Sequence, residues 1–204
     1  MRERKKQATE KALREAALRL ALEHGPDNVR VDDIAEAAGV SPRTYNNYFS
    51  SREEAILAEI TAEREARVAR ALAAAESRHA RSAVAVVEAV VLTYTDPGDT
   101  DHAVLLLIAT APSLRHAFLD TTAAVGPPLT AALTERFGPE DAEVLAASVA
   151  AAVRIALQRW LRPMGSAAGP AGLVVPTGSL PDLLRGALAP LIPALEAADG
   201  APPG

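Results

Sequence analysis

Hydrogen-bonding side chains are concentrated in one short segment near the N terminus of this 204-residue chain. The segment carries a guanidinium, a hydroxyl and two amide groups, on Arg43, Thr44, Asn46 and Asn47. Groups of this kind recognise another polar surface by donating and accepting hydrogen bonds. Because asparagine is a poor helix former, two asparagines on a helix of seven or eight residues favour polar recognition over stability.

The residues around this segment have the pattern of a helix, a tight turn and a second helix. The two helices are expected at residues 31–38 and 42–49. Gly39 supplies the backbone freedom that ends the first helix, Ser41 is a good N-cap, and Pro42 suits the first helical position. Small residues stand where two such helices would cross, at Ala35, Ala38 and Val40. This is the pattern of a helix-turn-helix, in which one helix enters a groove of DNA.

The aromatic residues of the second helix have two different expected roles. Tyr45 and Phe49 are four residues apart, so both can face the neighbouring helices and anchor this one. Such anchors matter because short helices are unstable alone. We expect Tyr48 at the surface, since its ring carries a polar tip.

Charge is distributed unevenly along the chain. The net charge of −5 by itself argues against a nucleic-acid partner. Residues 1–52, however, contain 10 Lys/Arg and 8 Asp/Glu, whereas residues 53–204 contain 11 and 18. The basic excess is concentrated at Arg2, Arg4, Lys5 and Lys6. A basic arm therefore precedes an acidic body, although ordinary solvated surface charge accounts for the same pattern.

The composition predicts an all-α protein. Apolar residues make up 49% of the chain and aromatic residues 3%, and alanine and leucine favour helices. The absence of cysteine excludes disulfides and thiolate metal sites, and no apolar run reaches the ~20 residues that span a bilayer. We therefore expect a cytoplasmic protein that does not enter a membrane.

We expect neither an enzyme nor a metal or cofactor site. The sequence has no nucleophile elbow and no glycine-rich phosphate loop. The four histidines do not pair at a spacing of three or four residues; they are His24, His79, His102 and His116.

Apolar periodicity and helix breakers predict about nine helices. Apart from the two described above, they are expected at residues 9–24, 52–79, 81–94, 102–111, 112–137, 139–162 and from 180 onward. Gly126-Pro127-Pro128 must kink or split the helix at 112–137, and Pro190 and Pro193 make the end of the last helix irregular. A turn is expected at 96–101, a loop at 164–179 and a disordered tail at 199–204.

The first fifty or so residues resemble the DNA-binding domain of the TetR-like transcriptional regulators, and the layout of the helices fits that family. The resemblance rests on Ile34-Ala35, Ala38-Gly39-Val40-Ser41, Thr44-Tyr45, Tyr48-Phe49 and Ser51-Arg52-Glu53-Glu54. It implies a three-helix DNA-binding domain at residues 1–52 and a helical ligand-binding and dimerisation domain at residues 53–198.

The resemblance also implies roles in DNA binding. Arg43 and Asn46 match positions that reach base edges, where arginine pairs with guanine and asparagine with adenine. Thr44 would touch a base or a phosphate, and Arg30 departs from the family's usual threonine, which caps the helix. The other DNA-binding candidates are Ser41, Asn47 and Tyr48 for phosphate, Pro42 at the helix start, Arg52 at the start of the next helix, and Arg4, Lys5 and Lys6 for sequence-independent attraction.

For the body, the resemblance implies an effector pocket and a dimer interface. Candidate pocket residues are the polar or large side chains that interrupt apolar faces: Glu88, Tyr94, His116, Phe118, Arg154, Gln158 and Trp160. For each of them a surface or packing role is favoured over ligand contact, and Trp160 is expected in the core because it is in line with core positions. Walls of alanine, valine and leucine would prefer an apolar or amphipathic molecule. The interface is expected on the last two helices, with Leu184, Leu188 and Leu191 supplying bulk.

Two hypotheses follow. The first is a homodimeric, ligand-responsive transcriptional repressor that binds a palindromic operator in double-stranded DNA. The alternative is a helical carrier of apolar ligands, or an interaction protein, with a non-functional helix-turn-helix. Binding to duplex DNA distinguishes the two.

Overall fold

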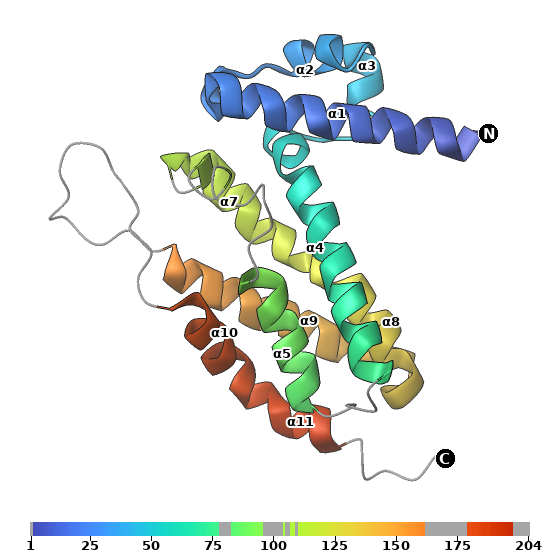
Figure 1. Ribbon diagram of the computed structural model, residues 1–204, viewed down its shortest axis with the longest axis vertical. Helices are drawn as coiled ribbons and strands as arrows, with labels where there is room; N and C mark the ends of the chain where they lie inside the picture. Colours follow the sequence, from blue (N-terminus) through green and yellow to red (C-terminus); the bar gives the residue numbers. More distant parts are fainter. Residues whose placement is uncertain are drawn as a thin grey trace, which may run out of the picture. The chain divides into compact units, whose positions relative to one another are not determined.

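The computed structural model describes residues 2–77, 83–95, 104, 107–108, 110–161 and 179–197, and within them every regular element is a helix (Figure 1). The prediction of an all-α fold is therefore confirmed. The chain divides into two units. The first contains Met1–Ala62 with Asp99–Phe118, and the second contains Glu63–Gly98 with Leu119–Gly204.

The helix-turn-helix lies in the first unit. Its helices are α1 (Arg2–His24), the short η1 (Pro26–Asn28), α2 (Val31–Ala37), α3 (Pro42–Tyr45) and the first turns of α4 (Arg52–Ser77). Leu13, Ala17 and Ala21 of α1 are fully buried, as is Ile34 of α2. Leu18 of α1 is also buried, whereas Leu20 is half-buried.

Two boundaries in this unit differ from those predicted. Helix α1 begins at Arg2 rather than near residue 9, because its first turns contain good helix formers and no breaker. Helix α3 ends at Tyr45 rather than at residue 49. The two asparagines that follow it are poor helix formers, so the chain continues in turns. The bond from the Phe49 amide to the Tyr45 carbonyl, at 3.1 Å, still closes the last turn.

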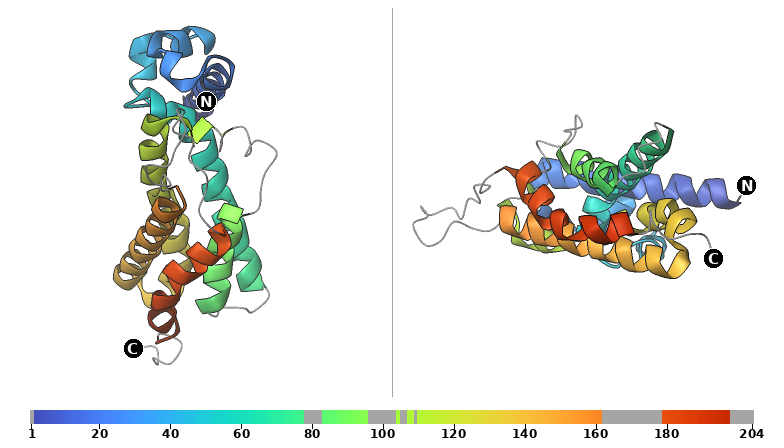
Figure 2. Two further views of the ribbon diagram at one scale, coloured as in Figure 1. Left: turned by 90° about the vertical axis from the view of Figure 1, so that its left-hand side faces the viewer. Right: turned by 90° about the horizontal axis from the view of Figure 1, so that it is seen from below.

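The second unit contains most of the remaining helices. They are the continuation of α4, α5 (Ala83–Thr95), the end of α7 (Pro112–Asp120), η2 (Thr121–Val125), α8 (Gly126–Phe137), α9 (Pro139–Trp160), α10 (Leu180–Leu188), η3 (Ala189–Leu191) and α11 (Ile192–Ala197). Helix α9 packs against α8 and α10, and α10 packs against α5 (Figure 2). Buried Val149, Val153 and Leu157 form the apolar face of α9.

Prolines divide two of the predicted helices. The segment 112–137 forms α7, η2 and α8, so the helix splits before the glycine–proline motif and restarts at Gly126. Pro127 and Pro128 then lie in the first turn of α8, where a missing N–H costs nothing. Pro190 and Pro193 likewise fall at the starts of η3 and α11.

Several expectations concern residues outside the described part of the chain. They are the turn at 96–101, most of the helix at 102–111, the end of the fourth helix at 79, nearly all of the loop at 164–179 and the tail at 199–204. None of the described helices is both long and apolar enough to cross a membrane.

Candidate nucleic-acid interface

Helix α3 turns its polar side chains outward. Arg43, Asn46 and Asn47 are exposed, as are Ser41 and Pro42 at the helix start. No ion pair within the described residues involves Arg43. The guanidinium and the two amides are therefore free to contact another molecule.

Ser41 caps α3 as its sequence predicts. The Ser41 Oγ accepts a hydrogen bond from the Thr44 amide at 3.1 Å, and the two hydroxyls are 2.9 Å apart. A bond of this kind satisfies one of the free amides at a helix start. It also fixes the orientation of the half-buried Thr44 side chain.

The opposite side of α3 is anchored by two aromatic rings. Tyr45 is 1% exposed and Phe49 is also buried, with ring centroids 5.7 Å apart. The Tyr45 hydroxyl donates to the Ser51 carbonyl at 2.8 Å, directly before α4. Burial raises the pKa of Tyr45 to about 12, with further contributions from Glu54 and Glu53, so the hydroxyl stays protonated at neutral pH. The predicted anchoring role of Tyr45 and Phe49 is confirmed.

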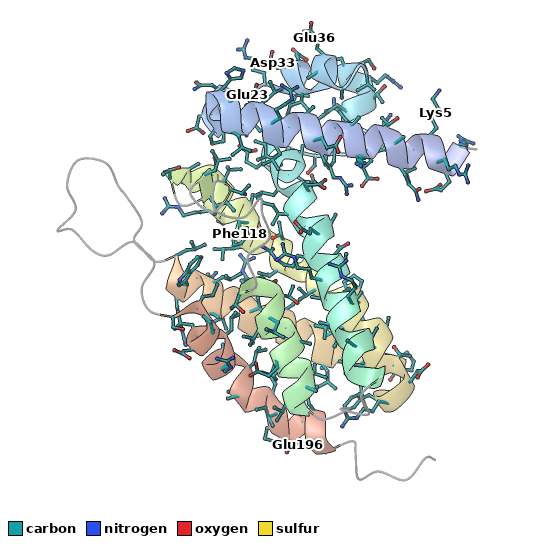
Figure 3. The ribbon with its side chains drawn as sticks, in the orientation of Figure 1. Lys5, Glu23, Asp33, Glu36, Phe118 and Glu196 are labelled. Carbon is teal, nitrogen blue, oxygen red and sulfur yellow. The ribbon has the colours of Figure 1, made fainter. Side chains whose placement is uncertain are left out.

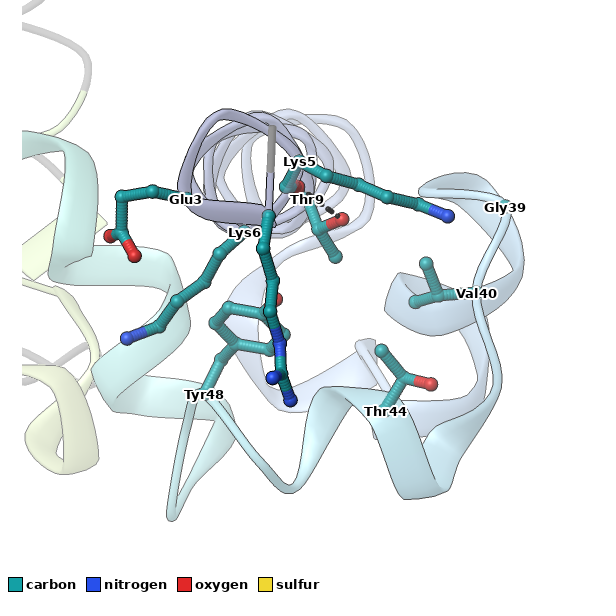
Figure 4. Close-up of a pocket in the computed structure, with 9 residues that line it drawn as sticks. Glu3, Lys5, Lys6, Thr9, Gly39, Val40, Thr44 and Tyr48 are labelled. Atoms are coloured by element: carbon teal, nitrogen blue, oxygen red, sulfur yellow. Dashed lines mark hydrogen bonds between the residues drawn. The ribbon is translucent and has the colours of Figure 1, made fainter.

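A groove of about 910 Å³ lies beside α3, between the turn of the helix-turn-helix and the first turns of α1 (Figure 4). In Figure 4, Lys5 extends toward Gly39, and Lys6 extends to the side of Tyr48. The complete lining is Arg2, Glu3, Lys5, Lys6, Thr9, Gly39, Val40, Thr44 and Tyr48. Three cations and one carboxylate thus border the edge of the exposed helix.

The arm residues separate into those that line the groove and one that does not. Arg2, Lys5 and Lys6 line it, whereas Arg4 does not. Successive residues of an α-helix are about 100° apart, so Arg4 lies on another face of α1. The arm is helical. Helical periodicity applied from residue 2 onward would therefore have indicated that Arg2 lies on the same face as Lys5 and Lys6.

Two acidic side chains of this unit lie away from the groove, although Glu3 lines it. Figure 3 shows Lys5 near the first turns of α1, and Glu23 near the opposite end of the same helix. Asp33, from α2, is on the side of Glu23. The nearly neutral composition of residues 1–52 therefore conceals a local basic surface.

Arg52 is held by the protein itself. Its Nη1 donates to the carbonyls of Asp27 and Val29 at 3.1 and 3.2 Å, and its Nε donates to Glu53 at 2.8 Å. These bonds fasten the start of α4 to the segment before α2. The sequence could not indicate this, because the partners are 25 and 23 residues away.

Arg30 precedes α2 where the sequence offers no capping side chain. The structure supplies the opposite half of a capping box, in which the Arg30 amide donates to the Asp33 carboxylate at 3.1 Å. The start of α2 is thereby fixed by Asp33, and the Arg30 side chain remains exposed.

The pocket candidates of the second unit occupy different environments. Tyr94 lies beneath the guanidinium of Arg64, which is 4.6 Å from its ring centroid. Arg154 pairs with Asp120 at 2.6 Å, and Glu88 forms two bonds to Arg185, which hold the pKa of Glu88 below its usual value.

The remaining pocket candidates differ in exposure. His116 and Gln158 are exposed, whereas Phe118 is buried in the first unit. Trp160 is half-buried, so its interpretation as a core residue is wrong. It lies in the last turn of α9, on the same helical face as Val149 and Val153, where that face reaches the end of the helix.

Sequence reasoning missed Arg64, which is 7% exposed. A signal existed: Arg64 interrupts a series of apolar residues with a spacing of four, which is the period of one helix face. The series is Ile56, Ile60, Val68 and Leu72.

Comparisons with known proteins agree with the helix-turn-helix geometry. Residues 13–59 match the model of the bacterial regulatory proteins of the tetR family. The chain is 42% identical over 62 residues to the HTH-type transcriptional regulator TcmR of Streptomyces glaucescens. That match spans 30% of this chain and only 27% of TcmR.

The whole fold also has a solved counterpart. FadR of Thermus thermophilus, a TetR-family transcriptional repressor crystallised with lauroyl-CoA, is similar over 96% of this chain and 100% of its own, with a TM-score of 0.53 and 21% identity. The likeness at this identity concerns the fold. The N-terminal domain of the chain, with its outward-facing α3, is therefore similar to the helix-turn-helix domain of the tetR family.

Proposed function

We propose that this protein is a transcriptional repressor that binds a palindromic operator as a homodimer and is released from it by an apolar or amphipathic small molecule. One observation carries the proposal: α3 buries Tyr45 while it exposes Arg43 and Asn46 beside a basic groove. Exposed arginine and asparagine on such a helix suit base readout, and the groove lysines suit phosphate.

Selection of bound fragments from genomic DNA tests the proposal. We expect the full-length protein to enrich fragments that share a palindrome, with half-sites about one helical turn apart. Binding that is weak and indifferent to sequence would contradict it. That outcome would instead favour the alternative, a carrier of apolar ligands with a non-functional helix-turn-helix.

A second prediction compares the lysines of the arm that line the groove with Arg4, which does not line it. Replacing Lys5 and Lys6 together with Ala should weaken operator binding and reduce the slope of log K against log salt by about 1 per lost phosphate contact. The matched variant Arg4→Ala should change the slope less, because Arg4 does not line the groove. Titrations by fluorescence anisotropy at several salt concentrations measure both, and equal slopes in the two variants would refute the assignment.

An exposed apolar stripe on α9 supports dimerisation. Val144 is 64% exposed and Ile155 is 44% exposed, and exposed Ala147 and Ala151 lie between them at helical spacing. Small residues allow close approach of a second helix. Leu184 and Leu188, expected at the interface, are instead fully buried within their own protomer, because α10 packs on α9 and α5.

We therefore expect Ile155→Glu to dissociate the dimer, since the carboxylate would be buried in an apolar interface. Leu92→Glu is the matched control, because Leu92 is 55% exposed but lies on α5. Sedimentation velocity at micromolar concentration measures the association state. A monomeric wild-type protein, or dissociation by the control alone, would contradict the proposed interface.

Helix α4 suits the transmission of an effector signal. It belongs to the first unit at its start and to the second unit from Glu63 onward. Its first turns are tied to the helix-turn-helix by Arg52, by the Tyr45–Ser51 bond and by the Arg14–Glu59 pair at 3.2 Å. We infer that an effector displaces α4 and the recognition helices with it. The effector must bind the DNA-free conformation more tightly than the DNA-binding one. Otherwise it does not change the relative populations of the two conformations.

A further inference from the structure

All the lysines of the chain lie near the start of α1. Only three of its 21 lysines and arginines are lysines, and they are Lys5, Lys6 and Lys11. A lysine amine that has lost its proton is a nucleophile, whereas the guanidinium of arginine stays protonated in proteins. Every side-chain amine that can react with an electrophile is therefore on the helix that borders the groove beside α3.

Two of these amines have different surroundings from the third. The side chains of Lys5 and Lys6 are exposed and line the groove. Within the described residues neither of them forms an ion pair. Lys11 does not line the groove, and its Nζ lies 3.7 Å from a carboxylate oxygen of Glu15 on the same helix. Lys11 is therefore an internal reference for any reaction of the other two.

The groove itself suits a small anion. Its lining carries the cations Arg2, Lys5 and Lys6 against a single carboxylate, that of Glu3. A cleft bordered mainly by charges of one sign raises the local concentration of ions of the opposite sign. The guanidinium of Arg2 can hold phosphate oxygens through two parallel hydrogen bonds while it keeps its charge. The groove thus combines a phosphate-binding cation with two amines.

We propose that the groove binds an acyl phosphate through Arg2, and that Lys5 and Lys6 are acylated by it. The unprotonated Nζ attacks the carbonyl carbon, so that a C–N bond forms and the C–O bond to the phosphate breaks. Inorganic phosphate leaves with the electron pair of the broken bond, and the nitrogen gives one proton to water. The product is an amide, so each acylated lysine has lost its positive charge.

The regulatory consequence rests on the proposed function, in which the arm attracts the phosphates of an operator. Acylation removes the charges of Lys5 and Lys6 and should therefore weaken operator binding. The arginines of the chain do not react, so acylation changes the charge of the arm and leaves the second unit unchanged. Operator affinity would then respond to the supply of acyl phosphate as well as to an effector.

Two acyl donors of different charge test the site without DNA. Acetyl phosphate is an anion, N-succinimidyl acetate is neutral, and both acetylate amines. We expect acetyl phosphate to modify Lys5 and Lys6 of the full-length protein about 3- to 10-fold faster than Lys11, with a preference that shrinks at high salt. The neutral donor should show a smaller preference, because the groove does not concentrate it. Mass spectrometry of proteolytic peptides measures the rate at each lysine.

Two arginine variants separate the groove from the rest of the arm. Arg2→Gln should remove most of the preference of acetyl phosphate, whereas Arg4→Gln alters an arginine that does not line the groove and should retain it. The proposal is overturned if Lys11 reacts with acetyl phosphate as fast as Lys5 and Lys6. It is also overturned if the neutral donor shows the same preference, or if the preference survives in Arg2→Gln.

A double variant tests the effect on operator binding. Lys5→Arg combined with Lys6→Arg keeps both charges and removes both amines, while Lys11 remains. Acetyl phosphate should weaken operator binding by the wild-type protein, with a salt slope lower by about 1 per acetylated lysine, and should leave the affinity of the double variant as it was before treatment. Equal weakening of both proteins would contradict regulation through these lysines. The acylation rates are measured without DNA, so a failure of operator binding itself is recognised separately.

Discussion

Replacing Tyr45 with Ala is expected to unfold the helix-turn-helix and abolish operator binding. Removing a large buried aromatic side chain costs about 3–5 kcal/mol, and the total stability of a domain is only about 5–15 kcal/mol. Among the residues that the structure describes, Tyr45 is the largest fully buried side chain, and it joins the four-residue α3 to the start of α4. A helix of that length does not persist without its anchor.

Tyr45→Phe separates the ring from the hydroxyl. It should cost about 1 kcal/mol, because only the bond to the Ser51 carbonyl is lost. It should also remove a pH dependence. The folded pKa of about 12 exceeds the unfolded value of 10.0, so the unfolded chain loses its proton first. The stability contributed by the hydroxyl is therefore complete below pH 10 and falls as the pH rises toward 12.

Urea unfolding followed by circular dichroism, together with limited proteolysis of the N-terminal unit, measures these effects. Tyr48→Ala is the control, since Tyr48 is only half-buried beside the groove. A Tyr45→Ala protein with wild-type stability would refute the anchoring role. Equal alkaline destabilisation of the wild-type and Tyr45→Phe proteins would refute the hydroxyl bond.

The sequence predicted Tyr45 and Phe49 correctly because helical spacing and apolarity are local properties. The same is true of the Ser41 cap, whose partner Thr44 is three residues away. The predicted end of α3, at residue 49, was wrong. The reason is also local, because the asparagines that suit recognition weaken the helix. Local chemistry thus predicted the motif better than its boundaries.

Contacts between distant residues could not be predicted in this way. Arg52 has the type and position of a DNA-binding residue, yet its donors are bonded to carbonyls of the segment before α2. Leu184 and Leu188 have the pattern of an interface, yet packing between helices buries them within the chain. Arg64 and Thr121 are 57 residues apart, so only the fold reveals their bond.

Arg43→Ala and Asn46→Ala are expected to lower operator affinity without lowering stability. A bidentate contact to a base discriminates against the wrong base by about 1–3 kcal/mol, which corresponds to about 5- to 150-fold. A homodimer would carry each substitution twice, so the loss for two half-sites approaches the square of that factor. Arg43→Ala should relax specificity at a guanine and Asn46→Ala at an adenine.

The design of this test follows from the exposure of both side chains. Substitutions at exposed sites usually change stability by less than about 0.5 kcal/mol, and Asn46 lies just past the last residue of α3. Any loss of affinity therefore reflects a lost contact and not a lost fold. Binding is measured on the selected operator and on single-base variants, with the Lys5 and Lys6 double variant as the control that weakens all sequences alike. If Arg43→Ala and Asn46→Ala weakened every sequence equally, their side chains would contact the backbone of the DNA, and the proposed base readout would be wrong.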